Sequence, residues 1–195
     1  FSEYFQVMEM RQRKKQYPEF IVKLSPVLMN LGLEYMNVIP GFRLSLCGYK
    51  RNDTFYLDRQ KMNGNYPDIV TYMETALGKM LRNDYLYFGN ILMICQYLQK
   101  HSLKDDEVHN QVTEIFEKLR LVEEKTRNLI AHEITNLSDK KIRNLTSNQN
   151  APDGLDAQAV MALLHKAVHL IYGHDIRWTY DDLNDKIISS LKENS

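Results

Sequence analysis

An apolar stripe of helical period in the second half of the chain constrains the fold most strongly. Between residues 108 and 137 apolar side chains recur at steps near three and four residues, the spacing of one buried helical face. Asp105 or Asp106 can cap the start of this helix with a side-chain oxygen. The pattern predicts one long helix packed against a core, and its buried positions are Val108, Val112, Ile115, Leu119, Val122, Leu129 or Ile130, and Leu137.

The same period dominates the rest of the chain, which has only eight Gly and five Pro among its 195 residues. Pro26 lies inside one of the helical patterns and is expected to kink that helix. We expect a single all-α domain over residues 1–195, built as a helical bundle. A first helix is predicted through about Met10 to Lys15. The further predicted helices run from Tyr17 to Pro40-Gly41, Pro67 to about Leu77, about Asn83 to His101, about Leu155 to Tyr172 with Gly173 ending it, and about Thr179 to Leu191.

Three segments interrupt the helical pattern. Residues 42–58 predict a short irregular or β segment, because Phe42 to Cys47 fits a strand as well as a helix. Residues 63–67 read Asn-Gly-Asn-Tyr-Pro and predict a turn. Residues 138–154 are polar and end in Asn-Ala-Pro-Asp-Gly, which predicts a surface loop.

Charge and composition limit the classes of partner. The formal net charge is zero, so any affinity for nucleic acid has to come from a local patch. The clearest basic run spans residues 11–15, and a solvated helix face is its favoured interpretation. Cys47 and Cys95 have no metal-type spacing and suit a reducing cytoplasm. No segment predicts a membrane span or a signal peptide, and because the chain begins without Met we expect a fragment of a longer protein.

The hexamer Arg127-Asn-Leu-Ile-Ala-His132 combines groups suited to cutting RNA. Asn128 and His132 are four residues apart and share a helical face, whereas Arg127 lies about 140° around the helix from His132. An imidazole can move protons near neutral pH, a guanidinium can stabilise charge on phosphate, and an amide can orient either one. Attack by the ribose 2′-hydroxyl would leave a 2′,3′-cyclic phosphate and a 5′-hydroxyl, with no metal ion required.

A second pair of histidines has a spacing known from zinc sites. His165 and His169 are four residues apart on one helical face. The zinc-protease pattern, however, needs Glu after the first His, and Lys166 stands there with no evident third ligand. A structural or surface role is the favoured interpretation, and we expect neither a metal nor a cofactor.

Other polar and aromatic residues offer weaker candidates. Tyr85, Tyr87 and Phe88 could stack nucleobases, although core packing is the favoured interpretation. Glu124 lies four residues before Asn128 and could approach the site, but a solvated carboxylate is the plainer interpretation.

The hexamer resembles the defining motif of HEPN ribonucleases, in which Arg is followed by a polar residue, three variable residues and His. Arg127, Asn128 and His132 match the fixed positions. The segments at 17–26 and 180–184 extend the resemblance to a narrower family, the Csm-family effector ribonuclease of type III-A CRISPR systems. The resemblance implies the C-terminal HEPN domain of a CARF-HEPN protein, with Arg127, Asn128 and His132 as its catalytic residues.

The resemblance also implies partners. In that family a CARF domain binds cyclic oligoadenylate, and two HEPN domains of a homodimer form one composite site that degrades single-stranded RNA in antiviral defence. No CARF sheet is recognisable here, so the activator is expected on a domain outside this chain. Some members of the family also cut cyclic oligoadenylate in the HEPN site. Two alternatives stay open: a HEPN toxin of a toxin–antitoxin pair, and a non-catalytic HEPN dimerisation module.

Overall fold

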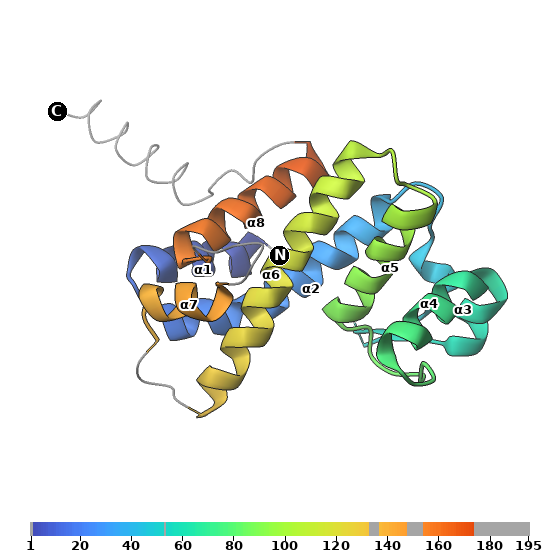
Figure 1. Ribbon diagram of the computed structural model, residues 1–195, viewed down its shortest axis with the longest axis horizontal. Helices are drawn as coiled ribbons and strands as arrows, with labels where there is room; N and C mark the ends of the chain where they lie inside the picture. The colour runs from blue at the N-terminus through green and yellow to red at the C-terminus, as the bar shows by residue number, and fades with distance from the viewer. Residues whose placement is uncertain (1, 53, 133–136, 148–153, 174–195) are drawn as a thin grey trace, which may run out of the picture.

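The computed structural model describes residues 2–52, 54–132, 137–147 and 154–173, without the side chains of residues 127–132. Within these ranges the structure is a helical bundle with one small hairpin, which confirms the predicted all-α fold with a short β segment (Figure 1). Its elements in chain order are α1 (Ser2–Arg13), α2 (Tyr17–Val38), the 3-10 turn η1 (Leu44–Leu46), β1 (Gly48–Arg51), β2 (Thr54–Leu57), α3 (Arg59–Asn65), α4 (Pro67–Leu77), α5 (Phe88–His101), α6 (Glu107–His132), α7 (Asp139–Thr146) and α8 (Ala157–Tyr172).

Helices α2 and α6 form the centre of the bundle. Both pack against α5 and α8 and against each other, while α1 lies along α2 and α7 lies against α6. Helices α3 and α4 stand at the far end beside α5 (Figure 1). The predicted stripe of α6 is buried at Val112, Ile115, Leu119 and Val122, whereas Val108 is 45% exposed. The apolar period therefore identified buried side chains correctly on the described part of this stripe except at Val108, but Leu137, although buried, is not helical and does not belong to α6, which ends at His132.

Local signals set several helix ends as predicted. The Asp106 carboxylate accepts a hydrogen bond from the His109 amide, at 2.8 Å, and so caps the start of α6. Pro67 opens α4, where its missing amide hydrogen costs nothing. Gly173 ends α8 in the left-handed conformation, which glycine adopts without strain.

The hairpin accounts for the predicted irregular segment at 42–58. Strands β1 and β2 pair antiparallel with Tyr49 opposite Tyr56, and Asn52 turns the chain with a positive φ of 47°. A Cβ atom at Gly48 would collide with the carbonyl oxygen of Tyr56, so the close pairing requires glycine there. Residues 84–86 add a third extended segment, because the Leu86 amide donates to the Phe55 carbonyl at 2.9 Å.

Three predicted boundaries were wrong. Residues 63–65 are helical and belong to α3, because the Asp58 side chain caps that helix and Met62 anchors it in the core. The helix expected from Asn83 begins instead at Phe88, since the residues before it pair with the hairpin. The segment expected to be a loop at 138–154 contains α7, because the Ser138 side chain caps this helix and the Ile142 side chain is buried in the core. The helix expected from Thr179 lies outside the described residues.

Helix α6 also buries a histidine. His109 is almost fully buried, with Nδ1 lying 2.7 Å from the Tyr35 hydroxyl and Nε2 lying 3.0 Å from the Cys95 carbonyl oxygen. A carbonyl accepts only, so Nε2 carries the hydrogen and Nδ1 accepts from the tyrosine. Burial lowers the pKa of His109 below its usual 6.5, although the Cys95 carbonyl and the Asp106 charge oppose this shift.

This neutral histidine should make the fold acid-sensitive. The unfolded chain takes up a proton near pH 6.5 that the folded chain does not, so the free energy of unfolding should decline as pH falls below about 6.5. The decline from this residue is at most about 1.4 kcal/mol per pH unit, and it stops below the folded pKa. Urea denaturation of wild type and His109→Gln between pH 7.5 and 5 measures it. Equal pH slopes in the two proteins would contradict the assignment.

Candidate active site

The hexamer Arg127–His132 forms the last turns of α6. Its predicted place late in the long helix is therefore confirmed for the backbone. The side chains of Arg127, Asn128 and His132 lie outside the described residues, and their catalytic role stays a prediction. The site is accordingly built from the helix that carries them and from the described residues around it.

One face of α6 borders an open groove. Positions 128 and 132 continue, at helical spacing, a row that includes Glu117 and Leu121. Glu117, Leu121 and Glu124 line the α6 side of this groove, which has a volume of about 590 Å³. The α5 side of the groove is lined by Gly89, Asn90, Leu92, Met93 and Gln96. By helical spacing, positions 128 and 132 lie in line with this row, beyond Glu124, the last α6 residue that lines the groove.

A buried polar network lies one turn before the hexamer. The side chain of Glu123 is nearly buried and accepts hydrogen bonds from Ser25 of α2 and from Arg120, the latter at 2.6 Å. Arg120 also pairs with the exposed Glu124 at 2.8 Å. The Ser25 hydrogen bond ties α6 to α2, while Arg120, on α6 itself, supplies the positive charge that a buried carboxylate requires. Glu124 is solvated as predicted, yet it also has a partner in Arg120.

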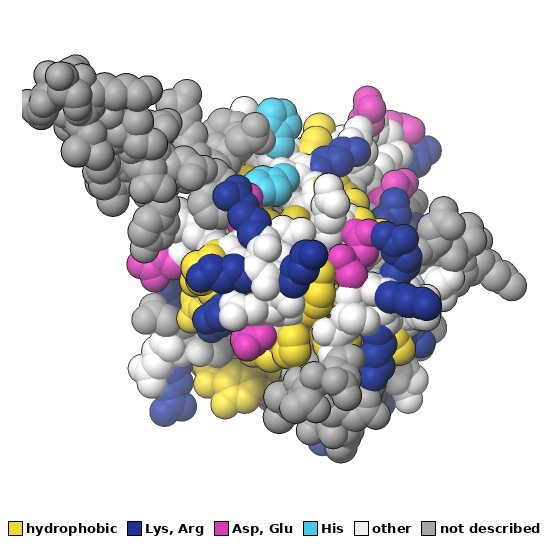
Figure 2. All heavy atoms as spheres, turned by 90° about the vertical axis from the view of Figure 1, so that its left-hand side faces the viewer, with side chains coloured by type: hydrophobic (Ala, Val, Ile, Leu, Met, Phe, Trp, Pro, Cys, Tyr) yellow, Lys and Arg dark blue, Asp and Glu magenta, His cyan; other side chains and the backbone are white. Residues whose placement is uncertain are grey.

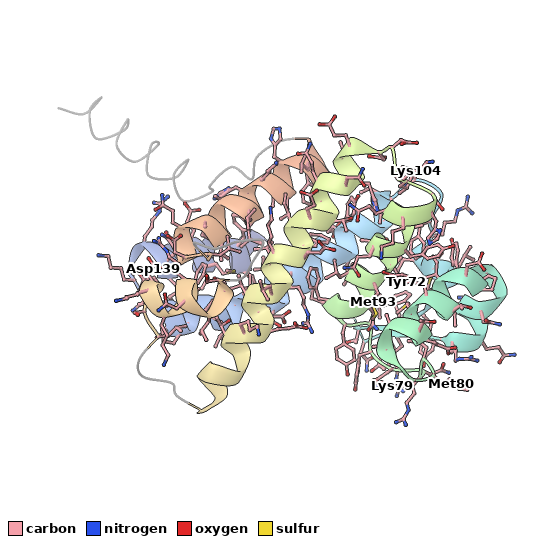
Figure 3. The ribbon with its side chains drawn as sticks, in the orientation of Figure 1. Tyr72, Lys79, Met80, Met93, Lys104 and Asp139 are labelled. Atoms are coloured by element: carbon pink, nitrogen blue, oxygen red, sulfur yellow. The ribbon has the colours of Figure 1, made fainter. Side chains whose placement is uncertain are left out.

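Helix α7 flanks the end of α6 and is fixed by one aspartate. Asp139 accepts from the Tyr17 hydroxyl at 3.2 Å and from the Ala157 amide at 2.9 Å, so it joins α2, α7 and α8 (Figure 3). Lys140 and Arg143 of α7 are exposed. Figure 2 shows Lys and Arg side chains spread over the face that carries α1 and α7. Asp and Glu side chains lie among them in the same view, and Arg143 pairs with Asp156.

The basic run of α1 contributes to this face. Arg13 is exposed and pairs with Glu9 at 2.7 Å, and Lys14 and Lys15 are exposed beyond the end of the helix. The predicted solvated helix face is confirmed.

The histidine pair on α8 has a structural setting. The His165 ring packs edge-to-face on Phe5 at 5.0 Å, and its Nε2 lies 3.7 Å from a Glu9 oxygen. His169 is exposed. Among the described residues no group of three or more His, Cys, Asp or Glu side chains could hold a metal ion. These contacts agree with the structural or surface role favoured from the sequence.

The two thiols are equally poor candidates for chemistry. Cys47 and Cys95 are both buried and unpaired with each other. Burial raises the pKa of each thiol to about 12, although the Lys61 charge opposes the shift at Cys47. Both side chains therefore stay protonated near neutral pH and are weak nucleophiles.

Across the described chain, no helix combines the length and apolarity that a membrane span needs.

The aromatic run at 85–88 divides between core and surface. Phe88 is buried, as expected, but Tyr85 and Tyr87 are 47% and 54% exposed, so the core prediction was wrong for both tyrosines. The physical reason is an extended backbone, in which successive side chains point to opposite faces and Leu86 takes the buried side. The alternation of tyrosine with Leu86 and Phe88 is visible in the sequence and could have predicted that Tyr85 and Tyr87 are exposed.

Comparison with known proteins identifies one family. A family model described as the Cas_Csm6 HEPN domain matches residues 1–188, almost the whole chain. No curated protein and no solved structure gives a significant match.

Proposed function

The chain belongs to the Cas_Csm6 HEPN domain family of CRISPR-associated ribonucleases, and from this premise we propose that it cuts single-stranded RNA without a metal ion. The predicted resemblance to a Csm-family HEPN domain is thereby confirmed. The observation that supports the finer proposal is the place of the hexamer at the end of α6, where positions 128 and 132 continue in sequence the row whose Glu117, Leu121 and Glu124 line the groove.

The three residues of the hexamer divide the chemistry. His132 moves the protons: an imidazole takes the proton of the ribose 2′-hydroxyl or supplies one to the leaving 5′-oxygen. Arg127 stabilises the negative charge that develops on the phosphorane. Asn128, on the same helical face as His132, orients the imidazole or the phosphate. The products are a 2′,3′-cyclic phosphate and a 5′-hydroxyl.

A single helix supplies one imidazole, whereas the reaction uses both a base and an acid. A homodimer in which two α6 helices meet would place the second imidazole across a shared cleft. We propose this composite site, with Arg127, Asn128 and His132 contributed by both copies. A wholly non-catalytic dimerisation module would not need both Arg127 and His132.

The proposal extends to the wider protein. We propose that residues 1–195 form the C-terminal HEPN domain of a cytoplasmic type III CRISPR effector in antiviral defence. A CARF domain outside this chain would bind cyclic oligoadenylate as the activator.

Product chemistry tests the metal-free mechanism directly. Purified chain is mixed with end-labelled single-stranded RNA in excess chelator, and the new ends are analysed with and without phosphatase treatment. We expect undiminished cleavage in chelator, 5′-hydroxyl ends that a kinase labels directly, and 3′ ends that resist phosphatase until the cyclic phosphate is opened. Cleavage that needs added Mg²⁺ and leaves 5′-phosphates would refute the mechanism, and a well-formed dimer without any cleavage would favour the dimerisation module.

A further inference from the structure

Four tyrosines form a continuous surface on the hairpin end of the molecule. Tyr49 faces Tyr56 across the β1–β2 register, and Tyr56 bridges to Tyr85 on the third extended segment. Side chains directly opposite in adjacent strands lie on the same face of a sheet. The rings of Tyr49 and Tyr56 are nearly parallel with centroids 5.6 Å apart, Tyr85 follows at 4.8 Å, and Tyr87 follows Tyr85 at 6.3 Å. We call Tyr49, Tyr56, Tyr85 and Tyr87 the tyrosine platform.

Much of the platform is open to solvent. Tyr49, Tyr85 and Tyr87 are each about half exposed, and the nearby Met80 is 66% exposed. The neighbouring Leu86 and Phe88 are buried, so the same segment supplies the core with other side chains. The rings differ in orientation, since Tyr49 and Tyr56 stack at 6° while Tyr85 is turned 40° from Tyr56 and 71° from Tyr87. Exposed aromatic rings can stack nucleobases of any sequence.

Basic side chains surround the platform. Arg51 of β1 is exposed and shares a face of the strand with Tyr49, because side chains two residues apart lie on one side of a strand. Lys79 and Arg82, in the turn after α4, line a pocket together with Tyr85 and Tyr87, and Figure 3 shows Lys79 beside Met80 at this end of the molecule.

Two carboxylates at this end of the molecule have partners of their own. Asp84, which lines the same pocket, accepts from the Tyr85 amide at 2.7 Å. Glu74 pairs with Arg59 at 2.7 Å. Stacking faces surrounded by cations are complementary to a single-stranded polyanion with free bases.

The platform also connects to the candidate active site. Tyr87 lines the pocket beside Lys79 and also the groove between α5 and α6. The groove reaches Glu124, which precedes His132 by eight residues, roughly 12 Å along a helix. A strand lying on the platform could therefore enter the groove, pass Glu117 and Glu124, and leave it at the end nearer to the hexamer.

We propose that the tyrosine platform stacks bases of single-stranded RNA beside the cut, while Lys79 and Arg82 contact its phosphates. This inference rests on the proposed ribonuclease function, since it assigns a second contact to the same substrate. It makes the platform a positioning surface that holds substrate and takes no part in the chemistry. Cross-strand tyrosine pairs can also merely stabilise a hairpin, so the test has to separate ring stacking from folding.

The test measures RNA affinity in the His132→Ala background, where the probe, a fluorescein-labelled 20-nucleotide single strand, stays intact. We expect Tyr85→Ala with Tyr87→Ala to weaken binding about 5- to 150-fold per stacked base lost. Tyr85→Phe with Tyr87→Phe keeps the rings and should bind within about twofold of the parent. Tyr4→Ala, which removes a similarly exposed tyrosine from α1, is the matched control and should not change the affinity.

A second variant leaves the rings in place. Lys79→Ala with Arg82→Ala should lower the slope of log affinity against log salt by about 1.4, which corresponds to two phosphate contacts on a single strand. An unchanged slope, together with unchanged affinity in the double tyrosine-to-alanine variant, overturns the proposal. Unchanged RNA affinity with an altered sedimentation coefficient also overturns it and makes the platform a protein contact.

The platform and the ribonuclease proposal can fail separately. If wild type cuts RNA but the platform variants bind normally, the platform alone is wrong. If wild type fails to cut RNA yet its binding depends on Tyr85 and Tyr87, the platform stands and the catalytic assignment falls.

Discussion

The rate of single-stranded RNA cleavage is expected to fall about 10²- to 10⁴-fold in His132→Ala, the usual contribution of a positioned acid–base group. In a composite site the substitution removes both imidazoles at once, so neither the 2′-hydroxyl nor the 5′-oxygen has a proton carrier. Initial rates in excess chelator measure the effect. His101→Ala, which removes an exposed histidine at the end of α5, is the matched control and should cleave at the wild-type rate.

Two further readouts separate a catalytic role from a structural one. The position of His132 on the groove row predicts a Tm close to wild type for His132→Ala, because surface substitutions seldom change stability by more than about 0.5 kcal/mol. Arg127→Ala should also cleave slowly, and Arg127→Lys should restore only part of the rate, since an ammonium cannot fork onto two phosphate oxygens. Wild-type cleavage by His132→Ala, or a large drop in its Tm, would refute the assignment.

Local sequence signals predicted much of this fold because the forces behind them are local. The start of α4 follows from Pro67 and the end of α8 from Gly173, each of which acts within its own turn. The start of α5 could not be found this way. Residues 84–86 are extended because the Leu57 amide donates to the Asp84 carbonyl and the Leu86 amide donates to the Phe55 carbonyl. Both hydrogen bonds join segments that are distant in the sequence.

The apolar stripe of α6 shows, at a single residue, that local sequence signals do not report contacts between helices. Hydropathy assigned Val108 to the buried face, but the structure exposes Val108 and buries His109 beside it. An imidazole is buried at low cost there because Tyr35 and the Cys95 carbonyl satisfy both of its nitrogens. Those partners come from α2 and α5, so no pattern within α6 could reveal them.

Only part of the candidate site could be predicted from the sequence. The hexamer at 127–132 was recognised from sequence because the spacing of its residues on one helix is a local property. The groove and the tyrosine platform were missed because they arise where α5, α6 and the hairpin meet. The alternation of tyrosine with apolar residues around Leu86 was the one local sign of the platform. It was overlooked because a helix was predicted over that segment.

The free energy of unfolding is expected to fall by about 3–5 kcal/mol in Phe116→Ala, the usual cost of deleting a buried ring. Phe116 is fully buried on α6, where its ring meets Tyr35 of α2 at 5.8 Å and Phe88 of α5 at 5.1 Å. The substitution leaves a cavity between three helices, and the loss corresponds to a Tm decrease of about 6–20 °C in a chain of this size. Thermal denaturation by circular dichroism measures it.

The matched control lies on the same helix. Val108→Ala removes an apolar side chain that is 45% exposed, so its free energy of unfolding should stay within about 0.5 kcal/mol of wild type. Equal losses in Phe116→Ala and Val108→Ala would mean that α6 does not pack through the face described. Cleavage per folded molecule should remain near wild type in Phe116→Ala well below its Tm, the reverse of the pattern expected for His132→Ala. That pattern would give helix α6 two separable functions, because the face that meets α2 and α5 would hold the bundle together while the proposed catalytic row would carry the chemistry.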